Sequence, residues 1–231
     1  RSEYPGFDAL QKIKGKTNFF TLGNWGGGSR LLPDAVLSEK IKYYQREIAK
    51  VQEIGMTDDL YFYSYDEISH HEINIPAARQ MSGALKKAFP QLRLLQTSFP
   101  NENIRDIFNV WCPIFDEFVS APKRKLLNDL KERGDEIWWY AADAPVKPYP
   151  NFFLDYPVFD CRIIGTLSYK YQVTGLLYWS INREWETNLT TREQWEQSGA
   201  WKPYIFHIIH KTRKNKNGMG NLVYPGRNGE L

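Results

Sequence analysis

The sequence has few cysteines, few histidines, little net charge and no long apolar run, and each shortage excludes a class of protein. Among its 231 residues are 2 Cys and 4 His, and no spacing typical of a zinc site appears among them. A net charge of +3 is too small to indicate a nucleic-acid-binding surface. No run approaches the ~20 apolar residues that a membrane-spanning helix needs. We therefore expect no metal, no cofactor, no nucleic-acid partner and no membrane span.

The two cysteines, Cys112 and Cys161, leave two interpretations open, which are two buried thiols or one disulfide bond. Both lie in apolar company, Cys112 next to Trp111 and Cys161 within two residues of Phe159 and Ile163, and this favours buried thiols. Asn188 begins the one glycosylation sequon of the chain, Asn-Leu-Thr. Because short sequons arise often by chance, it is a weak indication of a secreted or extracellular protein. The chain begins without the pattern of a signal peptide, so we expect any such peptide to lie outside it.

Aromatic residues, by contrast, are abundant, at 15% of the chain with 8 Trp and 14 Tyr. This excess fits either a core or a surface that stacks against sugar rings, and composition does not choose between them. The hydrophobic content of 42% and the charged content of 25% are typical of a globular chain rather than a disordered one. The length suffices for one sizeable core or two small ones.

Strand patterns alternate with helical patterns along the chain. Apolar runs predict strands at residues 18–22, 60–65, 92–97, 107–112, 136–142 and 175–181. Apolar residues at helical spacing predict helices at residues 34–54, 76–89, 122–133 and 156–171. We expect a loop over residues 1–17 and an irregular C-terminal segment over residues 211–231. Because strand and helix alternate, the sequence predicts an α/β fold with a parallel sheet and crossover helices.

Residues 60–67, Leu-Tyr-Phe-Tyr-Ser-Tyr-Asp-Glu, combine an aromatic-rich strand with two adjacent carboxylates, Asp66 and Glu67. In a parallel β/α architecture, ligands bind at this carboxyl end of the strands. Two acids held there can divide acid–base and charge-stabilising roles between them. The same dipeptide recurs at residues 116–117 and 135–136, so a solvated turn is the alternative interpretation. The position directly after a strand distinguishes the first pair from the other two.

Four segments, in order and with consistent spacing, resemble the catalytic barrel of glycoside hydrolase family 123. They are Tyr-Ser-Tyr-Asp-Glu at 63–67, Trp-Trp-Tyr at 138–140, Pro-Asn-Phe-Phe-Leu-Asp-Tyr-Pro at 150–157 with Arg162, and Gly-Leu-Leu-Tyr-Trp-Ser at 175–180. A fifth, the glycine-rich segment 217–226, also resembles that family, except that Met219 stands where the family usually has an aspartate. Together these segments cover the chain from about residue 18 to residue 226.

The resemblance implies a TIM-like (β/α)8 barrel, of which we expect this chain to hold about six β/α units, with the N-terminal strands missing. Residues 1–231 would then form one partial barrel domain, with a β-sandwich domain expected upstream in the same protein. The resemblance also implies a retaining β-N-acetylhexosaminidase that typically acts on N-acetylgalactosamine in a glycan or glycoconjugate. Such enzymes use the acetamide of the substrate as the nucleophile, so no protein nucleophile is needed.

By the same resemblance, Glu67 is the general acid that protonates the leaving oxygen and then the base that activates water. Asp66 orients the acetamide N–H and stabilises the positive charge of the cyclised intermediate. Further substrate contacts are expected from aromatic, histidine and carboxylate side chains near the predicted strand ends. These candidates are Trp25, Tyr65, His70, Trp138, Tyr140, Asp143, Tyr178 and Trp179.

Each of these candidates has a structural alternative. Aromatic residues on buried strands are often core residues, and Trp138 and Trp139 must point to opposite faces, so we expect only one of them at the site. For Asp143 the alternative is a plain turn. Two further functions stay open for the whole chain. Met219 and the missing strands favour a non-catalytic glycan-binding or scaffold protein, and the basic residues 211–216 favour a barrel glycosidase for another sugar.

Overall fold

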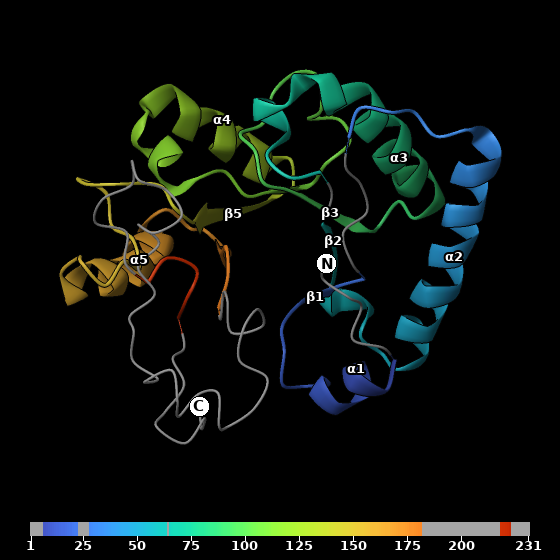
Figure 1. Ribbon diagram of the computed structural model, residues 1–231, viewed down its shortest axis with the longest axis horizontal. Helices are drawn as coiled ribbons and strands as arrows, with labels where there is room; N and C mark the ends of the chain where they lie inside the picture. The colour runs from blue at the N-terminus through green and yellow to red at the C-terminus, as the bar shows by residue number, and fades with distance from the viewer. Residues whose placement is uncertain (1–6, 23–27, 64, 182–217, 223–231) are drawn as a thin grey trace, which may run out of the picture. The chain divides into compact units, whose positions relative to one another are not determined.

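The computed structural model describes residues 7–22, 28–63, 65–181 and 218–222 (Figure 1). Its helices are α1 (Phe7–Ile13), α2 (Asp34–Glu53), α3 (Ile75–Ala88), α4 (Ala121–Glu132) and α5 (Val158–Lys170). Its strands are β1 (Phe20–Thr21), β2 (Leu60–Tyr63), β3 (Arg93–Gln96), β4 (Val110–Trp111), β5 (Glu136–Ala141) and β6 (Gly175–Tyr178). Strand and helix alternate over most of this length, as the sequence predicts.

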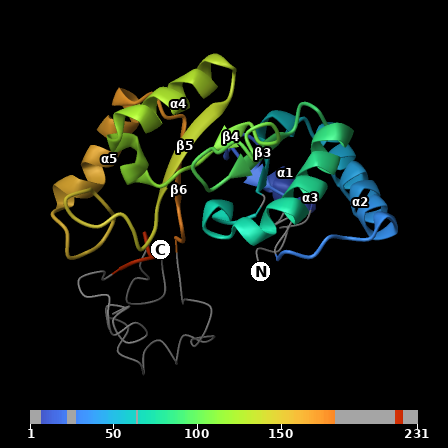
Figure 2. The ribbon, with the colours of Figure 1, turned by 90° about the horizontal axis from the view of Figure 1, so that it is seen from above.

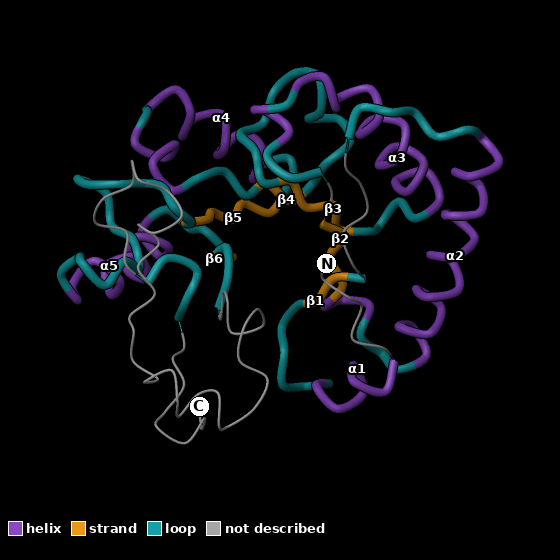
Figure 3. Tube along the Cα trace, in the orientation of Figure 1, coloured by secondary structure: helices purple, strands orange, loops and turns teal. Residues whose placement is uncertain are grey.

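Each strand pairs in parallel with the strand that follows it along the chain, and Figure 3 shows β1 to β4 next to one another in that order. The strands are therefore ordered β1-β2-β3-β4-β5-β6 in the sheet. A doubly wound sheet reverses its order at a switch point, and these described strands contain no such reversal. The α/β class and the parallel sheet that the sequence predicts are confirmed.

The chain divides into two compact units, which we describe separately. The first comprises Arg1–Pro113 with Ala121–Ile137, and the second comprises Ile114–Ser120 with Trp138–Leu231. Strands β1 to β4 belong to the first unit, and β6 belongs to the second. Strand β5 begins in the first unit and continues in the second.

Helices α2 and α3 lie side by side in the first unit (Figures 1 and 2). The apolar stripe predicted for α2 is buried, for example at Tyr44 and Val51, as expected for an amphipathic helix. The Tyr44 ring meets Phe62 of β2 edge to face, with centroids 4.7 Å apart. Because side chains alternate along a strand, Tyr61 and Tyr63 point away from the face that α2 covers.

Two boundaries in the first unit differ from the prediction. The predicted loop at residues 1–17 is wrong for Phe7–Ile13, which form α1 around the fully buried Leu10. A helix of 7 residues is too short to produce a clear periodic pattern in the sequence. Strand β2 ends at Tyr63 instead of continuing through Tyr65, where the chain bends.

Aromatic packing dominates the described part of the second unit. Trp139 of β5 has no exposed surface. Its ring packs with Phe115, Phe118 and Tyr171, whose ring centroids lie 4.2, 5.0 and 6.1 Å away. Trp139 is therefore a core residue, and of the tryptophan pair in β5 only Trp138 faces the opposite side of the sheet.

Both cysteines are free thiols, so the disulfide interpretation is wrong. Cys112 is buried, as predicted, whereas Cys161 is exposed. Cys161 lies on α5, whose buried residues are Asp160 and Ile164. Residues that are close in sequence point to different faces of a helix, so the apolar residues near Cys161 do not place its own side chain in the core. Within the described ranges, no helix combines the length and the apolar character required to cross a bilayer.

Candidate active site

Asp66 and Glu67 lie in a turn that follows β2, and we call residues 65–70 the acid turn. Asp66 is exposed and Glu67 is half-buried. The backbone of Glu67 is left-handed, with φ 40 and ψ 47. A residue with a Cβ rarely adopts this conformation, which costs roughly 1–2 kcal/mol. Strained backbone of this kind persists only where neighbouring groups hold it.

Two hydroxyl groups converge on one oxygen of Asp66. The phenol of Tyr63 donates to Asp66 Oδ1 over 2.6 Å, and Thr97, which follows β3, donates to the same oxygen over 3.0 Å. The two hydroxyl oxygens are 3.1 Å apart. Burial, and then the hydrogen bond to Asp66, raise the pKa of the Tyr63 phenol well above its usual value. The phenol therefore keeps its hydrogen and remains a donor to Asp66.

The end of β3 also holds the backbone of the acid turn. The N–H of Glu67 donates to Thr97 Oγ1 over 3.1 Å, and the N–H of Ser69 donates to Ser98 Oγ over 3.1 Å. Two consecutive hydroxyls of one strand end thus accept two backbone N–H groups of the neighbouring turn. The structure supplies here the partners that the strained conformation of Glu67 requires.

The carboxylate of Glu67 lies beside His70, within the acid turn. Glu67 Oε2 is 3.4 Å from His70 Nδ1, and the two side chains are 37% and 67% exposed, respectively. This contact becomes an ion pair only when the imidazole is protonated. The structure therefore brings three of the predicted site residues, Asp66, Glu67 and His70, into one solvent-accessible turn.

Tyr65, another predicted substrate contact, points into the core of the first unit. It is 2% exposed, and its hydroxyl lies 3.1 Å from the sulfur of Met81 on α3. This arrangement matches the alternative interpretation of Tyr65 as a packing residue. Trp25, also predicted to contact substrate, lies outside the residues that the structure describes.

The remaining predicted contacts lie in the second unit. Trp138 and Tyr140 are 4% and 7% exposed, and they share one face of β5. The Trp138 ring lies directly on the backbone of Gly175 in β6, where an added Cβ would fall 2.1 Å from a ring atom. Trp179, just after β6, is 44% exposed and presents the most accessible ring of this group.

Two further candidates of the second unit follow strand ends. Asp143 is half-buried in the bend after β5. Tyr178 is half-buried at the end of β6, and its hydroxyl accepts the N–H of Gly220 over 3.1 Å. Met219, beside Gly220, is 1% exposed and packs with Phe153. The segment 218–222 is thus attached to β6 and contributes an apolar side chain to the core.

The sequence interpretation missed Tyr63, Thr97 and Ser98. A signal for the last two was present, because Thr97 ends the predicted strand 92–97 and Ser98 follows it directly. Adjacent parallel strands place their carboxyl ends at one edge of the sheet, which is where ligands bind in such folds. Hydroxyl residues at the end of the strand next to Asp66 and Glu67 were therefore candidates to contact them.

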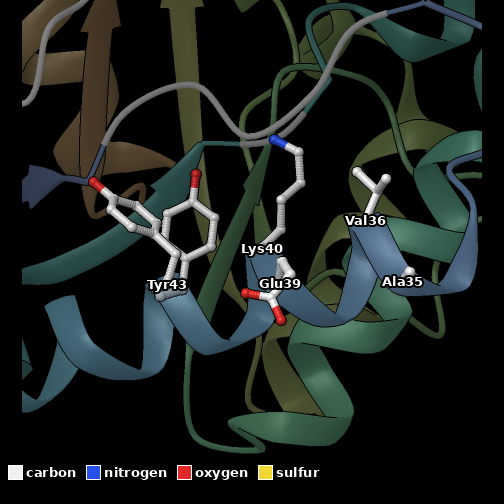
Figure 4. A pocket seen from close by; sticks show the side chains of 6 residues that line it. Ala35, Val36, Glu39, Lys40 and Tyr43 are labelled. Atoms are coloured by element: carbon white, nitrogen blue, oxygen red, sulfur yellow. The ribbon is translucent and has the colours of Figure 1, made fainter.

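Two hollows among the described residues lie away from the acid turn. One, of about 550 Å³, runs along one side of α2 (Figure 4) and is lined by Ala35, Val36, Glu39, Lys40, Tyr43 and Tyr44. The other, of about 390 Å³, is lined by Ile48, Thr57, Asp58, Leu60, Phe89, Gln91, Leu92 and Arg93. No group of three or more potential metal ligands occurs in the described part of the chain. No residue of the acid turn lines either of these two hollows.

Comparison with known proteins identifies the family to which the sequence is similar. The family model for the catalytic domain of glycoside hydrolase 123 matches residues 7–231, which confirms the resemblance of the sequence. No curated protein matches the chain. Among solved structures, the fold is similar to a family 123 glycoside hydrolase from Clostridium perfringens, described in a study of glycolipid glycan hydrolysis, with a TM-score of 0.59 and 12% sequence identity. The similarity covers 87% of this chain and 32% of that one, so this chain spans about a third of that protein.

Proposed function

The chain belongs to the glycoside hydrolase 123 catalytic-domain family, and from this premise we propose that it is a retaining β-N-acetylhexosaminidase. The proposed substrate is a glycan or glycoconjugate that ends in β-linked N-acetylhexosamine, with N-acetylgalactosamine as the first choice. The observation that carries the proposal is the acid turn. It presents two adjacent carboxyl groups at the carboxyl end of β2, and one of them, Asp66, accepts two protein hydroxyls.

In the proposed reaction, the acetamide oxygen of the substrate attacks the anomeric carbon and displaces the leaving oxygen. Glu67 gives its proton to that oxygen as the bond breaks, and a cyclic oxazolinium intermediate forms. Water then attacks the anomeric carbon while Glu67 takes up a proton from it, and the acetamide is restored. Asp66 accepts the acetamide N–H and stabilises the positive charge next to it. Oδ1 of Asp66 already accepts two hydroxyl hydrogens, which suits a carboxylate that acts as an acceptor and not as a proton donor.

We also propose that the six strands are part of a (β/α)8 barrel. Two observations support this. The parallel strands follow chain order without a reversal, which is the order in a barrel sheet, and the fold resembles that of a family 123 enzyme. A secreted or extracellular location stays a prediction, since the sequon at Asn188 lies outside the described residues.

Replacing Glu67 by Gln tests the proposed general acid. The variant keeps the size of the side chain and loses the transferable proton, so kcat/KM for an alkyl N-acetyl-β-galactosaminide should fall by roughly 10²–10⁴-fold. A nitrophenyl glycoside, whose leaving group needs less protonation, should lose less in the bond-breaking step. Glu72→Gln, which changes an exposed acid a few residues away, is the matched control and should retain activity. Full activity of Glu67→Gln on both substrates would end the proposal.

A sugar thiazoline that mimics the cyclised intermediate tests the internal nucleophile. Tight inhibition is expected, because a mimic of the intermediate should bind far more tightly than the substrate.

The buried Met219, which replaces the aspartate usual in the family, favours one alternative, a non-catalytic glycan-binding protein. That alternative predicts binding of N-acetylhexosamine without hydrolysis, and turnover at ordinary enzyme rates would reject it.

A further inference from the structure

We infer that Thr97 is a positioning residue for the proposed reaction, because its single hydroxyl orients Asp66 and at the same time fixes the backbone of Glu67. The inference rests on the proposed function of these two acids. Thr97 is 4% exposed, so it acts on a substrate through its neighbours. Nothing in the local sequence marks it apart from its place at the end of β3.

The hydrogen bonds of Thr97 link the two acids through one atom. A threonine hydroxyl has one hydrogen to donate and two lone pairs to accept with. The hydrogen points to Asp66 Oδ1, 3.0 Å away, and one lone pair accepts the Glu67 N–H over 3.1 Å. The side chain of the first acid and the main chain of the second are therefore held in register by Thr97 Oγ1.

Tyr63 completes the arrangement on Asp66. Its phenol donates to the same Oδ1 over 2.6 Å, so the protein occupies this oxygen with two donors. Oδ2 of Asp66 makes no hydrogen bond to any residue that the structure describes, and the side chain is exposed. One carboxylate oxygen is thus bound by the protein, and the other is left to accept the acetamide N–H of the substrate.

Glu67 depends on Thr97 in a different way. Its left-handed backbone, at φ 40, is a conformation that a residue with a Cβ avoids unless neighbours hold it. The bond from its N–H to Thr97 Oγ1 is a direct restraint on that backbone. Loss of the acceptor should let the turn relax, which would displace the Glu67 carboxyl from the leaving oxygen. A displacement of about 1 Å is enough to lower a rate by roughly 10²-fold.

The experiment compares Thr97→Val, which keeps the shape and removes the hydroxyl, with Thr97→Ser, which keeps the hydroxyl. Both are made in the full 231-residue chain. The first readout is amide hydrogen exchange of Glu67 by NMR, which should be about tenfold faster in Thr97→Val and within about threefold of wild type in Thr97→Ser. The second is kinetics on an N-acetylhexosaminide, where Thr97→Val should lower kcat by about 10–100-fold and change KM by less than about threefold.

Two further variants separate positioning from packing. Thr57→Val makes the same change next to the amino end of β2 and should leave Glu67 exchange and kcat unchanged. Tyr63→Phe removes the other donor to Asp66 and should lower kcat without changing the exchange of the Glu67 amide. If Thr97→Val does not fold, Thr97→Ala, which also removes the hydroxyl, carries the test with the same expectations.

Each outcome bears on a separate claim. Unchanged Glu67 exchange in Thr97→Val, or equal losses in Thr97→Ser and Thr97→Val, would overturn the positioning role. A wild-type protein that hydrolyses no N-acetylhexosaminide would overturn the proposed function instead, and amide exchange would still decide whether Thr97 holds the acid turn.

Discussion

A glycine at position 67 should make the protein more stable than an alanine there. Glu67→Gly and Glu67→Ala both remove the carboxylate and its contact with His70, so the two variants differ only in the backbone preferences of the new residue. At φ 40 alanine keeps the steric clash between Cβ and the backbone, and glycine does not have it. The comparison therefore isolates the strain in the acid turn.

The magnitude follows from two opposing effects. The left-handed conformation costs a residue with a Cβ roughly 1–2 kcal/mol, whereas glycine loses roughly 0.5–1 kcal/mol more than alanine in backbone entropy on folding. The difference between the midpoints of these ranges leaves Glu67→Gly more stable by about 0.75 kcal/mol. For a protein of this size, that corresponds to a melting temperature about 1–4 °C higher. At an ordinary negative φ the sign would be reversed, since only the entropy difference would remain.

Urea unfolding followed by tryptophan fluorescence measures this difference, and an unchanged m-value shows that the denatured state is comparable in both variants. Both variants should also lose glycosidase activity, because neither has a carboxyl group at position 67. An alanine variant equal to or more stable than the glycine variant would refute the assignment of strain to Glu67.

The other predictions concern packing and pH. Gly175→Ala would place a Cβ 2.1 Å from the Trp138 ring, so it should destabilise the protein by about 1–3 kcal/mol, measured by thermal unfolding. A destabilisation of less than about 1 kcal/mol would contradict this contact. Gly165→Ala, on an exposed face of α5 where an added Cβ meets nothing within 4 Å, is the control and should stabilise by about 0.5–1 kcal/mol. Burial raises the pKa of Tyr44 to about 12, whereas the pKa of a tyrosine in the unfolded chain is near 10. The contribution of the protonated Tyr44 phenol to the free energy of unfolding is therefore complete below pH ~10 and is lost as the pH rises through 12. Tyr44→Phe should therefore flatten the decline of stability above pH ~10, and an unchanged decline would contradict this.

Local patterns were sufficient to predict most elements of the fold. The helix at α2 follows from apolar residues at helical spacing, which bury one stripe that includes Tyr44 and Val51. The strand at β2 follows from an unbroken aromatic and apolar run, since both of its faces are covered. Patterns did not predict α1, because that helix is short. They also did not predict the exposure of Cys161, because α5 carries apolar residues on an exposed face.

In the candidate site, too, some residues could be predicted from the sequence and others could not. Asp66 and Glu67 could be proposed from the sequence because they follow a strand and lie in a segment that resembles the family. Tyr65, two residues after the strand ends, was expected beside them, but its ring turns into the core toward Met81. Alternation alone does not predict this, because the regular period of the strand stops at Tyr63 and the turn sets the direction of each later side chain.

By itself, the sequence determined the parallel α/β arrangement and the family, because these depend on residue types and on spacings along the chain. It also indicated Asp66 and Glu67 as candidate site residues, which stay a prediction. Only the tertiary structure decided which groups hold those acids in place. Thr97 is 30 residues from Glu67 along the chain, and their hydrogen bond exists because two parallel strands end at the same edge of a sheet. Such a contact depends on strand register and on one strained backbone conformation, and no local pattern in the sequence encodes either.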